Sequence, residues 1–403
     1  MKKRYVIVGT GMRCYTMFVR NLIDHFGDFC EIVGVYDTNK IRSEYFKKDI
    51  GEGCIQYFSF EEMLDAEKPD AVIVTTPDSF HHEYIIKALD AGYDAISEKP
   101  ITNTYERCRE IREAEKRSGK RVTVTFNCRF MPIFAKMKSL IAEGKIGRVY
   151  SINYNYYLNR SHGADYLKRW HRLMEFSEGM LLHKSTHHFD VVNWLLEDEP
   201  RFVSAIADQS FYNNKEKRLG ERCHTCKDRE KCESGVMQLD YLSDDLYYKA
   251  EGEDGYFRDR CAYGGDADIY DNISVSVKYN KGAILSYSLN LFSQREGYRL
   301  AIIGEKGAII TNIKSMEGGE DGIFFVDNSG NREKIDYEAA VGSHAGGDLK
   351  LLSMIFKGGE EDPLGMHATC FDGFASAIIG IGANISIKER KTVDLLPYLS
   401  SLK

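Results

Sequence analysis

The stretch YVIVGTGMRC, residues 5–14, begins as a short apolar run and ends in a turn that contains two glycines. The apolar run predicts a buried β-strand, and helical periodicity begins after the turn. Gly9 and Gly11 match the first two glycines of the G-x-G-x-x-G pattern, while Cys14 stands at the third position. Such a turn presents backbone N–H groups and the positive end of a helix dipole, which together bind a pyrophosphate.

Strands and helices alternate from this turn to about residue 128. Apolar runs predict strands at 5–9, 31–37, 71–76, 93–97 and 121–126, with a weaker one at 56–60. Most of them lack polar–apolar alternation, which is typical of parallel strands buried on both faces. The α/β order therefore predicts a Rossmann-type, doubly wound parallel sheet in a dinucleotide-binding domain of residues 1–128.

The second strand ends in Asp37. A carboxylate at this place accepts hydrogen bonds from the adenosine ribose and repels a 2′-phosphate. NAD is therefore favoured over NADP. The combination of strand, glycine turn, helix and acidic strand end carries this prediction, because a glycine pattern alone is weak evidence.

From residue 129 the pattern changes to that of a second domain, residues 129–403. A helix is expected over about 131–144, then a tyrosine-rich strand within 148–160 and further strands near 200–209, 271–279, 283–291, 298–304 and 307–313. Several alternate with a period of two and are separated by glycine turns. We expect an α/β domain with an open, mostly antiparallel sheet, and final helices at 347–357 and 365–387 that pack between the domains.

Three short motifs follow the later strands of the first domain: TTPDSFHHEY (75–84), SEKPI (97–101) and FNCRF (126–130). They resemble motifs of the glucose–fructose oxidoreductase, inositol dehydrogenase and rhizopine-catabolism (Gfo/Idh/MocA) oxidoreductase family, and the likeness extends over essentially the whole chain. With the glycine turn and Asp37, the resemblance implies the following cofactor-binding residues: Gly9, Gly11, Met12, Arg13, Asp37, Thr75, Thr76, Pro77, His81, Glu98 and Asn127.

Lys99 is the proton-transfer residue that the resemblance implies. Ligands of an open α/β sheet bind outside the carboxyl ends of its strands, and Lys99 follows the fifth strand. Its amine can hydrogen-bond the substrate hydroxyl that loses a proton as hydride leaves the carbon. Burial and a neighbouring cation would lower its pKa toward a useful value.

The stretch LLHKSTHHFDVVNWLL, residues 181–196, places three histidines and a lysine in an apolar run. As one buried helix it would align His183, His187 and Asp190 on one stripe and turn Lys184 and His188 aside. The family segment usually reads D-x-G-x-H-x-x-D. His187 and Asp190 match its histidine and last aspartate, whereas His183 replaces its first aspartate.

The histidines allow three interpretations. The resemblance implies acid–base catalysis by Lys99, His187 and His183, since imidazoles exchange protons near neutral pH. The H-x-x-x-H spacing also suits zinc, although the Glu of H-E-x-x-H is absent. Buried histidines with a structural role are the third interpretation.

The segment RSHGADYLKRWHR, residues 160–172, is rich in hydrogen-bonding and aromatic side chains. Such a set suits a polyol ring, with an aromatic ring stacked on its C–H face. An amphipathic, solvated helix is the alternative. The expected substrate-binding residues are Arg129, Tyr166, Arg169, Trp170, His171 and Asp190.

A polar insertion at about 212–265 contains RCHTCKDREKC, in which Cys223, Cys226 and Cys232 have C-x-x-C-x5-C spacing. Cys261 can complete a set of four, and His224 could replace one cysteine. Four thiolates in a reducing compartment suit a tetrahedral structural zinc ion, which would tie down a segment with little core of its own. An iron–sulfur cluster and unligated loop cysteines are the alternatives.

Composition excludes several classes of function. The net charge of -7 offers no basic surface for nucleic acid. No run of about 18 or more apolar residues is evident, so no membrane span is expected. The N-terminal run reads as a strand and not as a secretion signal, which favours the cytoplasm. The resemblance implies a homo-oligomer, a dimer or tetramer, that uses the exposed face of the second sheet.

Two enzymatic functions follow. The first is an NAD-dependent oxidoreductase that transfers hydride from a hydroxyl of a sugar, glycoside or cyclitol to the nicotinamide. The second is a redox-neutral glycosidase on the same scaffold, which acts by transient oxidation and elimination, with His183 as the additional base. A cofactor-sensing regulator without activity is disfavoured because the motif around Lys99 is intact.

Overall fold

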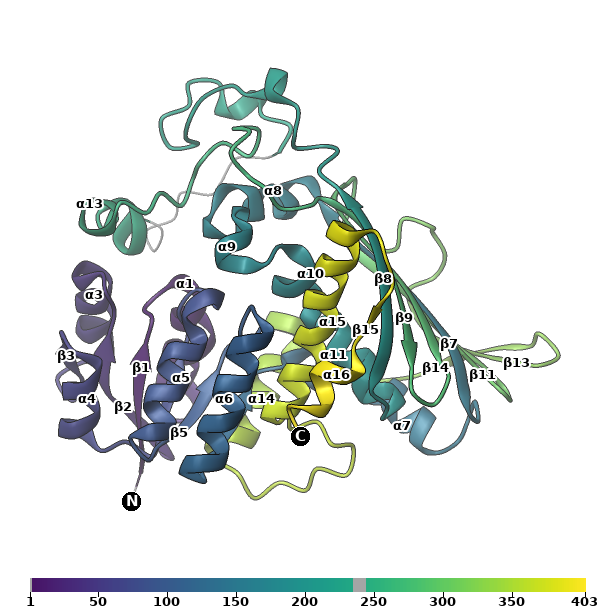
Figure 1. The fold of residues 1–403 in the computed structure, drawn as a ribbon, viewed down its shortest axis with the longest axis horizontal. Coiled ribbons are helices and arrows are strands. Elements are labelled where there is room, and N and C mark those ends of the chain that lie inside the picture. Colours follow the sequence, from purple (N-terminus) through teal and green to yellow (C-terminus); the bar gives the residue numbers. More distant parts are fainter. Residues whose placement is uncertain (1, 235–243) are drawn as a thin grey trace.

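The computed structural model describes residues 2–234 and 244–403, which form two α/β domains, each built on one sheet (Figure 1). The first sheet is parallel and has the order β3-β2-β1-β4-β5-β6. Its strands are β1 (Lys3–Val8), β2 (Cys30–Tyr36), β3 (Ile55–Tyr57), β4 (Ala71–Val74), β5 (Asp94–Ser97) and β6 (Val122–Val124). The predicted doubly wound Rossmann sheet is confirmed, including the weak strand at Ile55–Tyr57.

Helices cover both faces of this sheet. In chain order the helical segments are α1 (Met12–Cys14), the π-helical turn η1 (Tyr15–Val19), α2 (Arg20–His25), α3 (Lys40–Ile50), α4 (Phe60–Glu67), α5 (His81–Asp90) and α6 (Tyr105–Ser118). Capping residues set several ends. Thr104 accepts a hydrogen bond from the Arg107 amide at the start of α6, and Gly119 ends this helix with φ 69°.

A helix from late in the sequence completes the packing of the first domain. Helix α14 (Gly347–Phe356) contributes Leu351, Leu352 and Phe356 to the core under η1 and α2. The Phe356 ring meets the Tyr5 ring of β1 edge to face at 4.9 Å. Spatial grouping therefore departs from chain order, because this helix follows the second sheet in the sequence but packs on the first.

The second sheet has nine strands in the order β14-β13-β12-β11-β7-β10-β9-β8-β15. They are β7 (Val149–Asn159), β8 (Pro200–Asp208), β9 (Asn272–Tyr279), β10 (Ile284–Ser293), β11 (Gly297–Gly304), β12 (Gly307–Ile313), β13 (Gly322–Asp327), β14 (Arg332–Ile335) and β15 (Val393–Asp394). Only β7 and β10 pair in parallel among these strands of the described chain. The mostly antiparallel sheet is confirmed.

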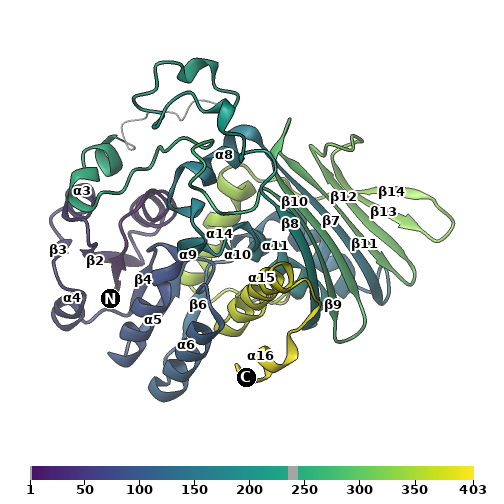
Figure 2. The ribbon, with the colours of Figure 1, turned by 45° about the horizontal axis from the view of Figure 1, so that its top comes forward.

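Helices α7 (Pro132–Ala142), α10 (Met180–His183), α11 (Ser185–Leu196) and α15 (Cys370–Glu389) lie on one side of the second sheet, between it and the first domain (Figures 1 and 2). Burial alternates residue by residue along β9, so its other face is exposed. Helix α15 is long and apolar enough to cross a membrane by length and composition, a feature not expected above. It is 67% buried and packs on β8 and α11, as a core helix does.

The predicted insertion leaves the second sheet after β8 and returns at β9. It runs over the top of the molecule and reaches α3 of the first domain (Figures 1 and 2). It includes the short turns η5 (Lys215–Lys217), η6 (Arg229–Lys231) and η7 (Asp244–Tyr248) and helix α13 (Glu251–Asp254). Residues 235–243 of the insertion lie outside the described part of the chain.

Candidate active site

The glycine turn after β1 is pressed against the turn after β4. Gly9 has φ 89°, and a Cβ built there would lie 2.6 Å from the Thr76 nitrogen. Backbone atoms cannot yield to such a contact, so only glycine fits at this position. Thr75 strengthens the junction, since its hydroxyl donates to the Gly9 carbonyl over 2.6 Å. The amides of the turn are thereby held at the carboxyl edge of the sheet.

The Asp37 carboxylate is hydrogen-bonded to this turn. One oxygen accepts hydrogen bonds from the Thr10 amide at 2.6 Å and the Thr10 hydroxyl at 2.9 Å. The other accepts from the Asn39 amide at 2.7 Å and lies 3.5 Å from the Arg42 guanidinium. The predicted carboxylate is therefore at the end of β2 beside the turn, as the sequence indicated.

His81 joins the ends of two strands. Its Nε2 lies 2.8 Å from the Thr76 carbonyl and its Nδ1 lies 2.7 Å from the Pro100 carbonyl. Burial lowers the pKa of His81. The imidazole thus positions the loops after β4 and β5, and Pro77 precedes the short turn η2 (Asp78–Phe80) between them.

The remaining predicted cofactor residues form a connected network. Arg13 donates to the buried Glu98 carboxylate over 2.8 Å, and Asn127 donates to Asp348 over 2.5 Å. Asp348, which lies on α14, is also 3.8 Å from Arg13. The sequence analysis did not identify Asp348, because only the fold brings α14 to this edge of the sheet.

Several buried polar atoms at this edge have no hydrogen-bond partner among the described residues. They are Thr76 Oγ1, Asn127 Oδ1, His187 Nδ1 and His171 Nδ1. An unpaired buried donor or acceptor costs free energy unless a ligand satisfies it. Together with the glycine turn and Asp37, these atoms fit a bound dinucleotide and a polyhydroxylated substrate.

Lys99 lies at the end of β5 in the midst of this network. Its ammonium donates to the backbone carbonyl of His183 over 2.8 Å. Burial lowers the pKa of Lys99 to about 8, and the charges of Lys184 and Arg13 act in the same direction. Asp78 and Glu98 oppose the shift. The expected lowering of the pKa is confirmed, and an amine of this pKa accepts a proton near neutral pH.

The histidine-rich stretch forms two helices and not the single one expected. Helix α10 ends at His183 and α11 begins at Ser185. In an unbroken helix the His187 amide would bond to the His183 carbonyl, but it donates to the Lys184 carbonyl at 3.3 Å. The break therefore makes the His183 carbonyl available to Lys99.

His183 forms a close pair with Asp78, a residue that the sequence analysis did not select. The Nδ1 atom of His183 lies 2.6 Å from the Asp78 carboxylate. Burial raises the pKa of Asp78 and lowers that of His183, so burial favours the uncharged form of each. The pair can hold a proton a short distance from Lys99. Asp78 falls inside the TTPDSFHHEY motif, which was the one signal that could have revealed it.

The other polar residues of the stretch have different surroundings. His187 is buried, and desolvation together with Lys99 and Lys184 lowers its pKa well below the usual range. His188 faces away, stacked on Tyr156 at 4.3 Å and bonded to the Tyr287 hydroxyl at 2.7 Å. Lys184 lies over the same Tyr156 ring, with its Nζ 5.4 Å from the ring centroid, and its charge still lowers the pKa of Lys99.

Arg129 and Asp190 are paired with each other. Both nitrogens of the Arg129 fork donate to the Asp190 carboxylate, at 2.6 and 2.8 Å, and Asp372 of α15 lies 3.0 Å from the same guanidinium. All of Asp190 is buried. The pair joins α11 to the loop after β6, so it supports the site, and its predicted contact with substrate stays a prediction.

The segment at 160–172 does reach the site. Helix α8 (Arg160–Lys168) and the turn η4 (Trp170–Arg172) bring Tyr166, Trp170 and His171 around His183, with ring centroids 5.6, 5.5 and 4.2 Å away. Trp170 stacks on His171 at 3.8 Å. Arg169 pairs with Asp165, and burial with the nearby Arg258 lowers its pKa to about 10. These residues form an aromatic and cationic wall beside Lys99.

Comparisons with known proteins agree with this geometry. Residues 3–126 match the Gfo/Idh/MocA oxidoreductase family, NAD-binding Rossmann fold, and residues 138–395 match its C-terminal alpha/beta domain. The chain belongs to the Gfo/Idh/MocA oxidoreductase family. It is an NAD(P)-dependent enzyme of that family.

Three relatives illustrate the family membership. YteT of Bacillus subtilis (strain 168), named as an oxidoreductase, is 35% identical over 425 residues, covering 98% of both chains. The scyllo-inositol 2-dehydrogenase (NAD(+)) of the same organism is 32% identical over 203 residues, which cover 50% of this chain and 56% of that enzyme. An oxidoreductase from Thermotoga maritima has the same fold, with a TM-score of 0.68 at 21% identity over 100% of both chains.

The four cysteines of the insertion lie near one another in this Gfo/Idh/MocA protein. Cys223, Cys226, Cys232 and Cys261 are free thiols that line one small cavity. Burial raises the pKa of Cys223, and the neighbouring thiols of Cys232 and Cys261 add to the rise. Within residues 2–234 and 244–403, no three His, Cys, Asp or Glu side chains are arranged as a metal ion requires. The predicted structural zinc therefore stays a prediction.

The pKa of Lys99 predicts a pH dependence for substrate oxidation. If the free amine of Lys99 accepts the hydroxyl proton, as the family resemblance implies, kcat/KM is expected to fall as the pH drops through about 8. Lys99→Met should lower kcat/KM by roughly 100-fold or more, the usual loss for a general base.

Lys184→Met removes a cation beside Lys99, so the pKa of Lys99 should rise and the break in the pH profile should move to higher pH. Lys116→Met, an exposed change on α6, is the matched control. An unchanged profile in Lys184→Met would show that the two ammonium groups are not coupled.

Proposed function

We propose that the chain oxidises a secondary hydroxyl of a sugar, glycoside or cyclitol and that NAD accepts the hydride. The observation that carries this proposal is the position of Lys99 at the carboxyl end of β5, where its ammonium donates to the His183 carbonyl over 2.8 Å beside the dinucleotide-binding turn. Burial lowers the pKa of this amine to about 8. Bound NAD supplies the hydride acceptor. The protein supplies Lys99 as the acceptor for the hydroxyl proton and the Asp78–His183 pair as the next proton carrier.

The side chains beyond Lys99 support a polyhydroxylated substrate. His171 and His187 offer buried imidazole nitrogens without partners among the described residues, and the Tyr166 hydroxyl lies 3.2 Å from His162. Trp170 offers an aromatic face of the kind that packs on the C–H groups of a sugar ring. The relative named as a scyllo-inositol 2-dehydrogenase supports the same substrate class.

A redox-neutral glycosidase is the second candidate. Elimination next to a transient ketone needs a base for the acidified C–H bond in addition to the one that accepts the hydroxyl proton. The Asp78–His183 pair, with its 2.6 Å contact beside Lys99, offers that second base. The two candidates share Lys99 and differ in whether NADH accumulates.

Incubation with a panel of sugars, cyclitols and aryl glycosides in deuterated water separates these functions. Substrate-dependent NADH that accumulates only with added NAD is the expected result, measured by absorbance. Catalytic aglycone release with deuterium at C2 and no net NADH would instead support the glycosidase and contradict the oxidoreductase. Lys99→Met should be inactive in either assay.

We also propose that NAD is preferred over NADP because of an ion pair contributed by the insertion. Asp37 repels a 2′-phosphate, whereas the adjacent Arg42 could bind one. The Asp254 carboxylate of the insertion, however, lies 2.5 Å from the Arg42 guanidinium and neutralises its charge. The ion pair with Asp254 therefore makes Arg42 unavailable to the 2′-phosphate of NADP.

Asp254→Asn tests this arrangement. Release of Arg42 should raise the ratio of kcat/KM for NADP to that for NAD by roughly tenfold, which corresponds to about 1.4 kcal/mol. Glu253→Gln is the matched control, since this residue is exposed and is not among the ion-pair partners of Arg42 in the described chain. A ratio that is the same in both variants would contradict the role of Asp254.

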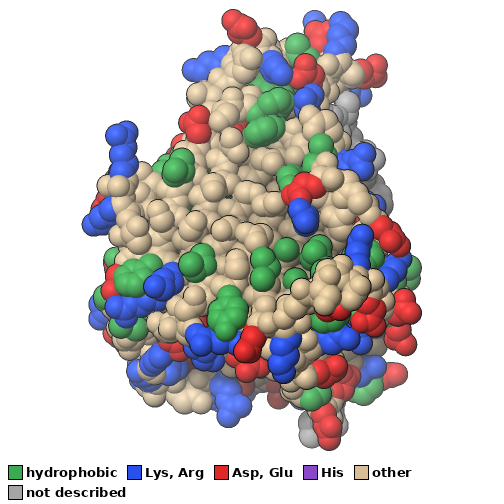
Figure 3. All heavy atoms as spheres, turned by 90° about the vertical axis from the view of Figure 1, so that its right-hand side faces the viewer, with side chains coloured by type: hydrophobic (Ala, Val, Ile, Leu, Met, Phe, Trp, Pro, Cys, Tyr) green, Lys and Arg blue, Asp and Glu red, His purple; other side chains and the backbone are tan. Residues whose placement is uncertain are grey.

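A third proposal is that copies of the chain associate through the outer face of the nine-stranded sheet. This face carries few charges at its centre (Figure 3). Cross-strand neighbours there are short and uncharged, as in the row Ser204, Ser276, Ser286 and Asn153. Ile206, Ile284 and Ile303 project from the same face and are 80%, 48% and 43% exposed. Such a flat, weakly polar sheet face is suited to a symmetric contact between copies.

Ser286→Arg should abolish that association. The side chain is exposed in a single copy, so an arginine there leaves the fold intact but places two buried charges in a contact between copies. Light scattering should show an oligomer for the parent chain and for the control Ser329→Arg, and a monomer for Ser286→Arg. A monomeric parent chain would contradict the proposal.

A further inference from the structure

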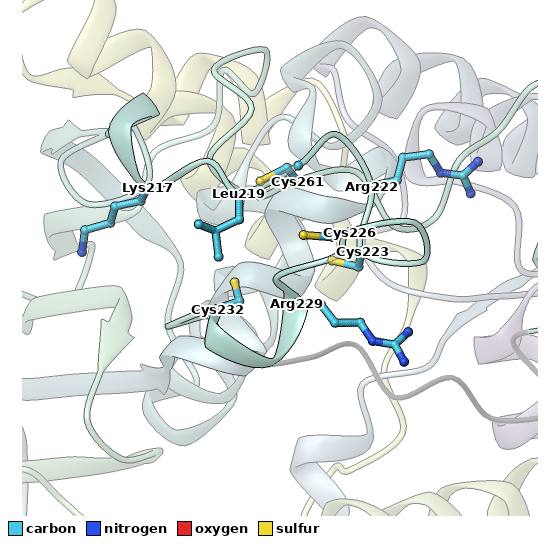
Figure 4. Close-up of a pocket in the computed structure, with 9 residues that line it drawn as sticks. Lys217, Leu219, Arg222, Cys223, Cys226, Arg229, Cys232 and Cys261 are labelled. Carbon is cyan, nitrogen blue, oxygen red and sulfur yellow. The ribbon is translucent and has the colours of Figure 1, made fainter.

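The four cysteines of the insertion surround a single small cavity. Cys223, Cys226, Cys232 and Cys261 line it together with Leu219 and Gly220, and its volume is about 20 Å³. Figure 4 shows the four sulfur atoms directed toward this space from three separate segments of chain. The cavity has room for one small ion. Lys217, Arg222 and Arg229 also line it, and Figure 4 shows their charged ends directed away from the four thiols.

The backbone holds these segments together before any ligand is bound. The Cys226 amide donates to the Cys223 carbonyl at 3.3 Å, which closes a tight turn with both thiols on it. The Cys223 amide donates to the backbone carbonyl of Asp259, and the Cys261 amide donates to the backbone carbonyl of Glu221, each over 2.8 Å. These two hydrogen bonds flank an antiparallel bridge between Arg222 and Arg260. These backbone hydrogen bonds therefore hold the cysteine turn beside Cys261.

The loop before the turn is shaped to leave the thiols uncovered. A Cβ at Gly220 would lie 3.0 Å from the Cys226 sulfur, so a larger residue would intrude on the cavity. Four thiolates around a space of this size are the donor set of tetrahedral zinc. Without a cation the four side chains are free thiols that are not gathered into a coordinating group. Binding of the ion, loss of the thiol protons and closure of the four sulfurs are therefore one event.

The cysteine turn is connected to the cofactor side of the protein through Arg222. This guanidinium pairs with Glu251 of α13 at 2.6 Å and with the buried Asp259 at 2.8 Å. Asp259 also accepts a hydrogen bond from the His224 amide, inside the cysteine turn, at 2.7 Å. A displacement of the turn is thereby transmitted to α13.

The segment that includes α13 rests on the dinucleotide-binding turn of the first domain. The Met12 amide donates to the Tyr247 hydroxyl over 2.8 Å, and Asn39 donates to the Ala250 carbonyl over 2.9 Å. Asp254 holds Arg42, beside Asp37. Tyr247 accepts from the very amide that the glycine turn presents to a pyrophosphate, and its own O–H can donate to a phosphate oxygen. The insertion therefore covers the adenosine and pyrophosphate end of the site.

We propose that Cys223, Cys226, Cys232 and Cys261 bind one zinc ion and that this site fixes the insertion as a clamp over the bound dinucleotide. The zinc half stands on the cysteine cavity alone, while the clamp half rests on the proposed use of NAD. Zinc holds the cysteine turn, Arg222 holds α13, and the segment from Tyr247 to Asp254 closes on the cofactor. Loss of zinc frees the clamp and speeds cofactor release.

Metal analysis of the purified full-length chain tests the zinc site. One zinc per chain is expected after dialysis, retained in the control Cys54→Ala and lost in Cys226→Ser. Replacement by Co²⁺ should produce an intense sulfur-to-cobalt charge-transfer band that is absent in Cys226→Ser. A parent chain without stoichiometric zinc and without this band, or one that contains iron with acid-labile sulfide, would overturn the assignment.

NADH binding, measured by its fluorescence, tests the clamp. Removal of zinc from the parent chain by a chelator should weaken NADH binding and accelerate NADH dissociation by roughly tenfold. Added zinc should restore the original affinity and dissociation rate. This experiment uses the parent chain and so does not depend on the folding of a variant. Tyr247→Phe should keep its zinc and still bind NADH more weakly. NADH affinity that is independent of zinc would overturn the clamp. A parent chain that binds zinc but no NADH would overturn the clamp and the proposed function together, and leave the zinc site standing.

Discussion

The hydrogen bond from the Lys99 ammonium to the His183 carbonyl joins the two domains at the point where chemistry is expected. A buried ammonium needs an acceptor, because the loss of its water shell is costly. The His183 carbonyl can accept from Lys99 only because α10 ends at His183, so this carbonyl lacks the amide partner that a continuing helix would supply. A helix break in one domain therefore sets the position of the amine at the end of a strand in the other.

The charges around this bond explain why histidines are useful in the site. Burial lowers the pKa values of His183, His187 and His171, and the charges of Lys99, Lys184 and Arg169 contribute to these shifts. These imidazoles are neutral near pH 7 and can pass a proton without adding charge to the site. The Glu98 carboxylate pairs with Arg13, so removal of Glu98 would leave an uncompensated buried charge.

Local sequence was a good guide wherever a single segment carried its own signal. The strand and glycine pattern of residues 5–14, the acidic end of β2 and the motif around Lys99 each lie within a few residues, and each is where it was expected. The helix at 181–196 was misjudged because its apolar pattern is continuous, while the break at Lys184 serves a hydrogen bond to another domain. Strands β13 and β14 were missed because they are short, and β14 is charged and largely exposed.

By itself the sequence determined the fold class, the family and the glycine turn after β1, and it predicted Lys99 as the proton-transfer residue, because these depend on periodicity and on residues close together in the chain. Only the tertiary structure decided the partners: Asp78 with His183, Asp348 with Asn127, Asp254 with Arg42, and Tyr247 with the Met12 amide. Each of these pairs joins residues at least 105 positions apart. Their contacts depend on how sheets and helices pack, and packing has no local signature in the chain.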